Sequence, residues 1–217
     1  MNLEQARFNM IEQQIRPWDV LDETVLATFG FIPREAFVPP QWKNLAFADI
    51  EIPLGNGEFM MHPRVEARML QALTISPDDR CLEIGTGSGF VTACLAHLSK
   101  HVDSVDIYED FTRQAEERLL SRELTNYSLH TGDALRGWVS TQLYNVIVVT
   151  GSVPAYLPRF EEQLAPGGRL FIVVGTAASM QAMLVTRQPE GDFSRTMLFE
   201  TGLKPLVGAA SGSSFTF

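Results

Sequence analysis

A glycine-rich segment, Glu83-Ile84-Gly85-Thr86-Gly87-Ser88-Gly89, carries the strongest chemical signal in this sequence. It follows a short apolar run and precedes a helical pattern over residues 90–98. Glycines let a ligand approach the backbone, and the N-terminus of a helix presents unpaired N–H groups to it. A dinucleotide fingerprint would need its third glycine at Phe90, and no Gly-Lys-Ser/Thr follows, so both common nucleotide loops are excluded. The segment predicts a different ligand loop, with a tight turn that binds nothing as the alternative.

The spacing Glu-x-Gly-x-Gly-x-Gly resembles the cofactor loop of class I S-adenosyl-L-methionine-dependent methyltransferases. Asp106 ends the next predicted strand, where an acid in such sheets bonds ribose hydroxyls. Asp133 follows the third strand, where these enzymes hold adenine, and Thr150 follows the fourth, where the reaction centre lies. The alternatives are a solvated strand end for Asp106 and an Asx turn for Asp133. The expected cofactor-binding residues are Glu83, Gly85, Thr86, Gly87, Ser88, Gly89, Asp106, Gly132, Asp133, Ala134 and Thr150.

Alternating strands and helices must position these residues. Apolar runs predict strands at 81–84, 102–107, 127–130, 145–149 and 170–174, with helices at 90–98, 109–123 and 156–164, the last stopped at Pro166-Gly167-Gly168. Continuous Val and Ile runs are typical of a parallel sheet covered on both faces, which makes the fold class α/β. Residues 183–187 and 196–200 flank a turn signal and predict an antiparallel C-terminal hairpin. The tail from Gly208 to Ser214 is expected to be mobile. The resemblance implies a Rossmann-like, mostly parallel seven-stranded sheet.

The N-terminal part of the chain reads differently. Helices are expected at 3–15, 22–29, 33–37 and 63–73, with Pro39-Pro40 ending the third. Residues 54–61 are expected to form a loop whose last residues, Phe59, Met60 and Met61, look exposed. We therefore expect a helical cap and substrate loop over residues 1–75 and a cofactor-binding core over 76–217, together forming one compact unit.

Several segments resemble the protein-L-isoaspartate O-methyltransferase family. The matching segments are Ile32–Val38, Ile52–Gly57, Leu82–Gly89, Gly132–Ala134, Asn145–Pro154, Leu164–Leu170 and Pro205–Val207. The resemblance implies an enzyme of protein repair that transfers a methyl group from S-adenosyl-L-methionine to a carboxylate of damaged aspartyl residues. Its partner is then a protein or peptide substrate.

One segment departs from the family pattern. Where the family has Gln-Thr-Ile-Ser-x-Pro, this chain has Glu58-Phe59-Met60-Met61-His62-Pro63, so Met61 stands at the position of the serine and Phe59 at that of the threonine. Phe and Met offer no strong hydrogen-bond donor to a carboxylate. The apolar run therefore either packs in the core or lines a pocket for another acceptor. A methyltransferase for a small-molecule or apolar acceptor, and a non-catalytic cofactor-binding module, remain as alternatives.

No catalytic residue is assigned. A carboxylate acceptor is ionised at pH 7, so its methylation needs no general base. A hydroxyl acceptor would need one, and His62 is the only candidate, with an exposed loop histidine as the alternative. His97 and His101 are four residues apart, but no carboxylate completes a metal set, and no metal is expected.

Composition sets the remaining limits. The 217 residues are 45% apolar and carry a net charge of -9, which favours one globular domain and argues against nucleic acid as a partner. No apolar run approaches the roughly 18 residues that cross a membrane. Cys81 and Cys94, the only cysteines, form no Cys-x-x-Cys pair, as expected for a reducing compartment. We expect a soluble cytoplasmic protein; the sequence carries no signal for an oligomeric state.

Overall fold

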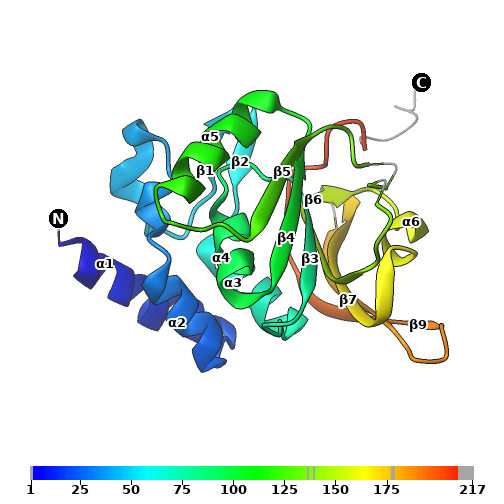
Figure 1. Cartoon of the computed structure of the whole chain (residues 1–217). Helices are drawn as coiled ribbons and strands as arrows, with labels where there is room; N and C mark the ends of the chain where they lie inside the picture. Colours follow the sequence, from blue (N-terminus) through cyan, green and yellow to red (C-terminus); the bar gives the residue numbers. More distant parts are fainter. Residues whose placement is uncertain (1, 136, 139, 177–178, 210–217) are drawn as a thin grey trace, which may run out of the picture.

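The computed structural model describes residues 2–135, 137–138, 140–176 and 179–209 (Figure 1). Its centre is a sheet of seven strands in the order β5-β4-β3-β6-β7-β8-β9. The strands are β3 (Arg80–Ile84), β4 (His101–Asp106), β5 (Tyr127–Thr131), β6 (Tyr144–Val153), β7 (Leu164–Thr176), β8 (Ser179–Arg187) and β9 (Phe193–Glu200). The predicted α/β fold class is confirmed.

The sheet changes direction once along its width. β5, β4, β3, β6 and β7 are parallel, whereas β7 pairs with β8 and β8 with β9 in antiparallel fashion, so the C-terminal strands form the predicted antiparallel part. The strand order reverses at β3, which has β4 on one side and β6 on the other. Open α/β sheets bind ligands beyond the carboxyl ends of the strands at such a point.

Helices lie mainly on one face of the sheet (Figure 1). The helices are α1 (Leu3–Met10), α2 (Glu23–Phe31), α3 (Pro63–Leu73), α4 (Phe90–Leu98), α5 (Glu109–Leu120) and α6 (Pro158–Glu161). Val146 and Val148 of β6 belong to the apolar cluster shared with α2, α3 and α4, while Ile147 and Val149 belong to a second cluster with Phe160 of α6. Both faces of β6 are buried, which explains its unbroken apolar run.

The N-terminal segment departs in part from the predicted helices. The helix expected at 3–15 is α only to Met10 and continues as a π-helix over Ile11–Ile15 and a 3-10 turn over Arg16–Trp18. α2 begins as predicted, because Asp22 accepts hydrogen bonds from the amides of Thr24 and Val25. A 3-10 turn covers Arg34–Ala36, and Pro40 starts another (Pro40–Leu45) where the sequence predicted an end.

The segment expected to be a loop at 54–61 is a β-hairpin, so that prediction was wrong. β1 (Ile52–Gly55) pairs with β2 (Glu58–Met60), and the turn between them uses positive φ angles of 117° at Gly55, 51° at Asn56 and 74° at Gly57. Of the three apolar residues predicted to be exposed, Phe59 is, at 44%, whereas Met60 and Met61 are buried. Pairing and burial, which local sequence does not reveal, set this hairpin.

A second correction concerns the helix expected at 156–164. It is the single turn α6, because Leu164 already starts β7, and Pro166-Gly167-Gly168 lie inside that strand rather than after a helix. There the pairing with β6 shifts register between Tyr144 and Val146. The predicted mobile tail lies outside the described residues from position 210 onward. None of the helices described is long and apolar enough to span a membrane.

Candidate active site

A cleft opens over the carboxyl ends of β3, β4, β5 and β6. It encloses about 960 Å³, counting the space at its open mouth. Most of the predicted cofactor-binding residues line it: Glu83, Gly85, Thr86, Gly87, Ser88, Asp106, Gly132, Asp133, Ala134 and Thr150. The fold thus brings together at one edge of the sheet residues that lie at or near the carboxyl ends of four different strands.

The glycine loop owes its shape to Gly85 and Gly87. Gly85 has a φ of +99°, and a Cβ atom there would lie 2.2 Å from Thr150 Oγ1. That hydroxyl donates to the carbonyl oxygens of Ile84 at 2.9 Å and Gly85 at 2.7 Å, so it ties the end of β6 to the end of β3. Gly87 has a φ of +51°. At Gly85 only glycine avoids strain, and at Gly87 glycine adopts this φ at no steric cost.

Gly89 differs from the other predicted glycines, because it does not line the cleft. A Cβ atom on it would lie 2.9 Å from Ala115 Cβ of α5, so close packing between α4 and α5 requires a glycine there. Thr86 and Ser88 also use their side chains within the protein: Thr86 Oγ1 is 2.7 Å from Ser104 Oγ, and Ser88 Oγ accepts from the Phe90 amide at 3.2 Å. The loop therefore presents mainly backbone to the cleft.

Asp106 lies at the end of β4 with both carboxylate oxygens engaged. Oδ2 accepts from the Gly87 amide at 2.8 Å and Oδ1 accepts from the Tyr108 amide at 3.0 Å. Burial raises the pKa of this carboxyl, and these two hydrogen bonds and the nearby charge of Glu58 act on it in opposite directions. Each oxygen keeps a lone pair that a hydroxyl of a bound ligand can reach.

Glu83 is a fully buried acid in the same wall. Its Oε2 accepts from Thr92 Oγ1 at 2.5 Å and from Ser104 Oγ at 2.6 Å. Its Oε1 finds no hydrogen-bond partner among the residues that the structure describes. Burial raises the pKa of this carboxyl to about 8. A buried acceptor beside a cleft suits a ligand that brings a donor or a positive charge.

The residues after β5 form another part of the wall. Asp133 Oδ1 accepts from the Leu135 amide at 2.8 Å, so the Asx turn weighed from the sequence is present, and the residue lines the cleft as well. Apolar neighbours that the sequence did not identify lie beside it, namely Ile107, Tyr108, Phe111 and Leu135. Together they offer an apolar surface beside a carboxylate, of a composition that suits a purine ring.

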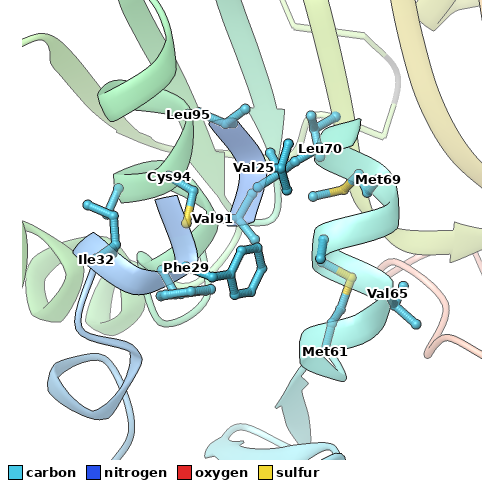
Figure 2. Packing of buried hydrophobic residues seen from close by; sticks show 14 of the residues in the cluster. Val25, Phe29, Ile32, Met61, Val65, Met69, Leu70, Val91, Cys94 and Leu95 are labelled. Atoms are coloured by element: carbon cyan, nitrogen blue, oxygen red, sulfur yellow. The ribbon is translucent and has the colours of Figure 1, made fainter. Parts of the chain in front are cut away.

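The segment that departs from the family pattern forms the opposite wall. Glu58, Phe59, Met60 and Met61 line the cleft, and Met60 and Met61 also belong to the core cluster, so this segment both packs in the core and lines the cleft. Figure 2 shows Met61 at the start of α3, among the buried side chains that join α2, α3 and α4. His62 lines an adjacent hollow instead, with Nδ1 3.3 Å from Asp49 Oδ1.

A buried arginine holds this wall in place. Arg34, fully buried, donates from Nε to the Ala46 carbonyl at 3.0 Å and from a terminal nitrogen to the Met61 carbonyl at 2.7 Å. Its other terminal nitrogen pairs with Glu66, a buried acid of α3 whose pKa burial raises to about 7. The sequence singled out Arg34 only as part of a matching segment, because its partners lie far along the chain.

The chain after β9 closes the cleft from the other side. Leu203, Lys204, Pro205, Leu206 and Val207 line it, and Pro205 bridges to Ser152 at the end of β6. The sequence matched Pro205–Val207 to a family segment but gave them no role. The sequence signal that could have found this role was a family-matching segment located beyond the last predicted strand.

These features define the class of protein. A parallel sheet, a glycine loop after its first strand, acids at the ends of the next strands and antiparallel strands at the far edge are the architecture of a Rossmann-like methyltransferase. The family model described as "Protein-L-isoaspartate(D-aspartate) O-methyltransferase (PCMT)" matches residues 5–211. The chain belongs to this family.

Individual relatives agree with the family match. The chain is 39% identical over 209 residues to protein-L-isoaspartate O-methyltransferase 2 of Pelobacter propionicus, covering 96% of this chain and 93% of that protein. It is 37% identical to the protein-L-isoaspartate O-methyltransferase of Koribacter versatilis, covering 93% and 90%. A Plasmodium falciparum protein assigned to the same activity, solved with S-adenosyl-L-homocysteine, matches with a TM-score of 0.78 at 18% identity over 95% and 98% of the two chains, which supports the fold.

Proposed function

We propose that this chain transfers a methyl group from S-adenosyl-L-methionine to the free carboxylate of L-isoaspartyl or D-aspartyl residues in proteins. The observation that carries the proposal is the cleft, in which the glycine loop and Asp106 face a separate wall formed by residues 58–61. Two reactants can therefore meet there. Family membership supplies the nature of the acceptor. We further propose that residues 1–75 serve as the acceptor cap and residues 76–217 as the cofactor core.

The residues of the cleft fit this cofactor. Its sulfonium and ammonium groups are cationic, and the wall supplies Glu83 with an unpartnered buried oxygen. Asp106 suits the ribose hydroxyls, and the apolar surface beside Asp133 suits adenine. The backbone of Gly85 and Gly87 leaves room for a close approach. We therefore propose the predicted set, without Gly89, as the residues that hold the cofactor.

The cofactor supplies an activated methyl group, and the protein supplies alignment and exclusion of water. A carboxylate oxygen of the acceptor donates an electron pair to the methyl carbon, the carbon–sulfur bond breaks, and its electrons stay on sulfur. The products are a neutral methyl ester and a neutral thioether, and no proton moves. The step therefore needs no general base, and His62, the candidate for one in the sequence, lies in the neighbouring hollow.

A radiolabelled methyl-transfer assay tests the proposal. The substrate is a peptide with one L-isoaspartyl residue, and the control is its twin with a normal aspartyl residue. We expect base-labile methyl ester on the first peptide only. Equal labelling of both peptides, or of neither at high enzyme concentration, would contradict the proposal.

A second acceptor class follows from Phe59. This side chain is 44% exposed and lines both the cleft and the adjacent hollow, in a wall that also contains Met60 and Met61. Such a surface favours an apolar acceptor. If isoaspartyl peptide stays unlabelled while calorimetry detects S-adenosyl-L-methionine binding, a screen of apolar carboxylic acids is the next experiment. Cofactor binding with no turnover on any acceptor would instead indicate a non-catalytic module.

A further inference from the structure

The charged side chains described in the lining of the cleft are almost all acidic. Among the described residues the acidic ones in its wall are Glu51, Glu58, Glu66, Glu83, Asp106 and Asp133. In that same lining, as far as the structure describes it, Lys204 is the one basic side chain. An acceptor that enters as a carboxylate meets repulsion from the ionised acids of this wall. Its charge can be compensated at only one of these side chains.

Lys204 stands where such compensation is needed. Its Nζ donates to the carbonyl oxygen of Gly57 at 2.6 Å and to Glu58 Oε1 at 2.6 Å. The ammonium group therefore lies at the β1–β2 turn, next to the wall in which Phe59 and Met61 replace hydroxyl residues. Its side chain is 40% exposed, so a ligand can reach it. Lys204 also lines the adjacent hollow, at the junction of the two spaces.

We propose that Lys204 is the acceptor-binding residue of this enzyme, and that the substrate carboxylate takes the place of Glu58 as its ion-pair partner. The inference rests on the proposed function. Lys204 supplies the donor that Phe59 and Met61 lack, and Glu58 occupies it until the substrate arrives. After transfer the ester is neutral and keeps no ion pair, so Glu58 returns to Lys204 and the product is released.

The change in the charge of the acceptor during the reaction determines whether Lys204 affects KM or kcat. The acceptor carboxylate is fully charged when it binds and loses charge as its oxygen bonds to the methyl carbon. The ion pair with Lys204 is therefore stronger in the bound substrate than in the transition state. Interactions of that kind lower KM and do not raise kcat. Lys204 should act on KM.

The experiment compares four single variants and one double variant on an isoaspartyl peptide. Lys204→Met removes the charge and keeps a stem of similar size, Lys204→Arg keeps the charge, and Glu58→Gln removes the competitor of the substrate. Lys100→Met is the matched control, because it removes one exposed lysine charge at the amino end of β4, away from the cleft. For each variant kcat, KM and the affinity for S-adenosyl-L-homocysteine are measured.

We expect Lys204→Met to raise KM about tenfold or more, while kcat and the affinity for S-adenosyl-L-homocysteine stay within twofold of wild type. Lys204→Arg should return KM most of the way to the wild-type value. Lys100→Met should match wild type. Glu58→Gln should lower KM a few-fold, and this gain should vanish in the Glu58→Gln/Lys204→Met double variant, since the two side chains compete through one interaction. Added salt should raise the KM of wild type more than that of Lys204→Met.

Three results would overturn the inference. An active wild type with an unchanged KM in Lys204→Met removes the role of Lys204 and leaves the proposed function standing. A loss that appears equally in kcat and cofactor affinity, without rescue by arginine, assigns Lys204 a structural role only. A wild type that does not distinguish isoaspartyl from aspartyl peptide overturns the proposed function and, with it, this inference.

Discussion

The amide of Gly87 donates a hydrogen bond to Asp106 Oδ2 at 2.8 Å, which joins the glycine loop to the end of the neighbouring strand. Gly85 is held in turn by Thr150 from β6. The loop between β3 and α4 is thus fixed from both adjacent strands, at the point where the strand order of the sheet reverses. A loop held in this way is preorganised, and a ligand does not have to order it on binding.

Gly85→Ala should abolish cofactor binding. The new methyl group would stand 2.2 Å from Thr150 Oγ1 at a φ of +99°, so the loop or the end of β6 must move. We expect at least a hundredfold loss of affinity for S-adenosyl-L-homocysteine, measured by calorimetry. Gly202→Ala, which meets no atom within 4 Å, is the control and should bind like wild type. Tight binding by the Gly85→Ala variant would contradict this account of the loop.

The buried Glu83 should make stability depend on pH. Its folded-state pKa of about 8 lies above the ordinary value of 4.5, so the folded protein keeps a proton that the unfolded chain releases. The contribution of this proton to the free energy of unfolding is complete at pH values below the pKa of Glu83 in the unfolded chain. It is lost as the pH rises to the pKa of Glu83 in the folded protein, with a slope approaching about 1.4 kcal/mol per pH unit.

Urea unfolding of wild type and Glu83→Gln between pH 5 and 9 measures this effect. The free energy of unfolding of wild type should fall with rising pH more steeply than that of the variant, because glutamine has no proton to release. Curves that run parallel over the whole range would show that Glu83 keeps an ordinary pKa.

Arg34 should be needed for stability. Replacing it with Met leaves the Glu66 carboxylate and the carbonyls of Ala46 and Met61 buried without a donor. We expect a loss of about 3–5 kcal/mol in the free energy of unfolding. Arg34→Met combined with Glu66→Leu removes the uncompensated charge and should recover part of that loss. A double variant less stable than Arg34→Met alone would contradict the importance of the buried charge.

Restoring the hydroxyl residues of the family should change the free energy of unfolding very differently at the two positions that depart from the family pattern. Phe59 is 44% exposed and Met61 only 5%. Phe59→Thr should change the free energy of unfolding by no more than about 0.5 kcal/mol, as surface substitutions do. Met61→Ser removes a large apolar side chain from the core and should cost about 2–4 kcal/mol. Thermal or urea denaturation measures both, and equal costs would place the two residues in similar environments, contrary to the structure.

The cofactor side could be predicted from the sequence because its residues lie at or near the ends of strands that apolar runs mark. α3 and α4 have the predicted bounds, since Pro63 and Gly89 mark their starts and apolar residues follow at regular positions. Local sequence did not reveal the β1–β2 hairpin, which has short strands and no clear alternation. Pro166-Gly167-Gly168 suggested the end of a helix, yet a register shift places them within β7.

The acceptor side depends on contacts between distant parts of the chain. Lys204 and Glu58 are 146 residues apart, and Arg34 and Met61 are 27 apart. Neither pair belongs to a motif whose spacing could be recognised. The sequence could show that hydroxyl residues are missing from this wall, whereas the side chain that lies beside it becomes visible only in the fold.

The three bonds of Arg34 have a consequence for how the molecule loses function. Through one side chain they join the 3-10 turn Arg34–Ala36, Ala46 at the end of the 3-10 turn Pro40–Leu45, Met61 just ahead of α3, and α3 itself. These segments should open together in a single local unfolding event, visible as correlated amide hydrogen exchange. The glycine loop is anchored separately by β4 and β6, so it can persist through that event. On mild heating the enzyme should stop methylating its acceptor while it still retains the cofactor.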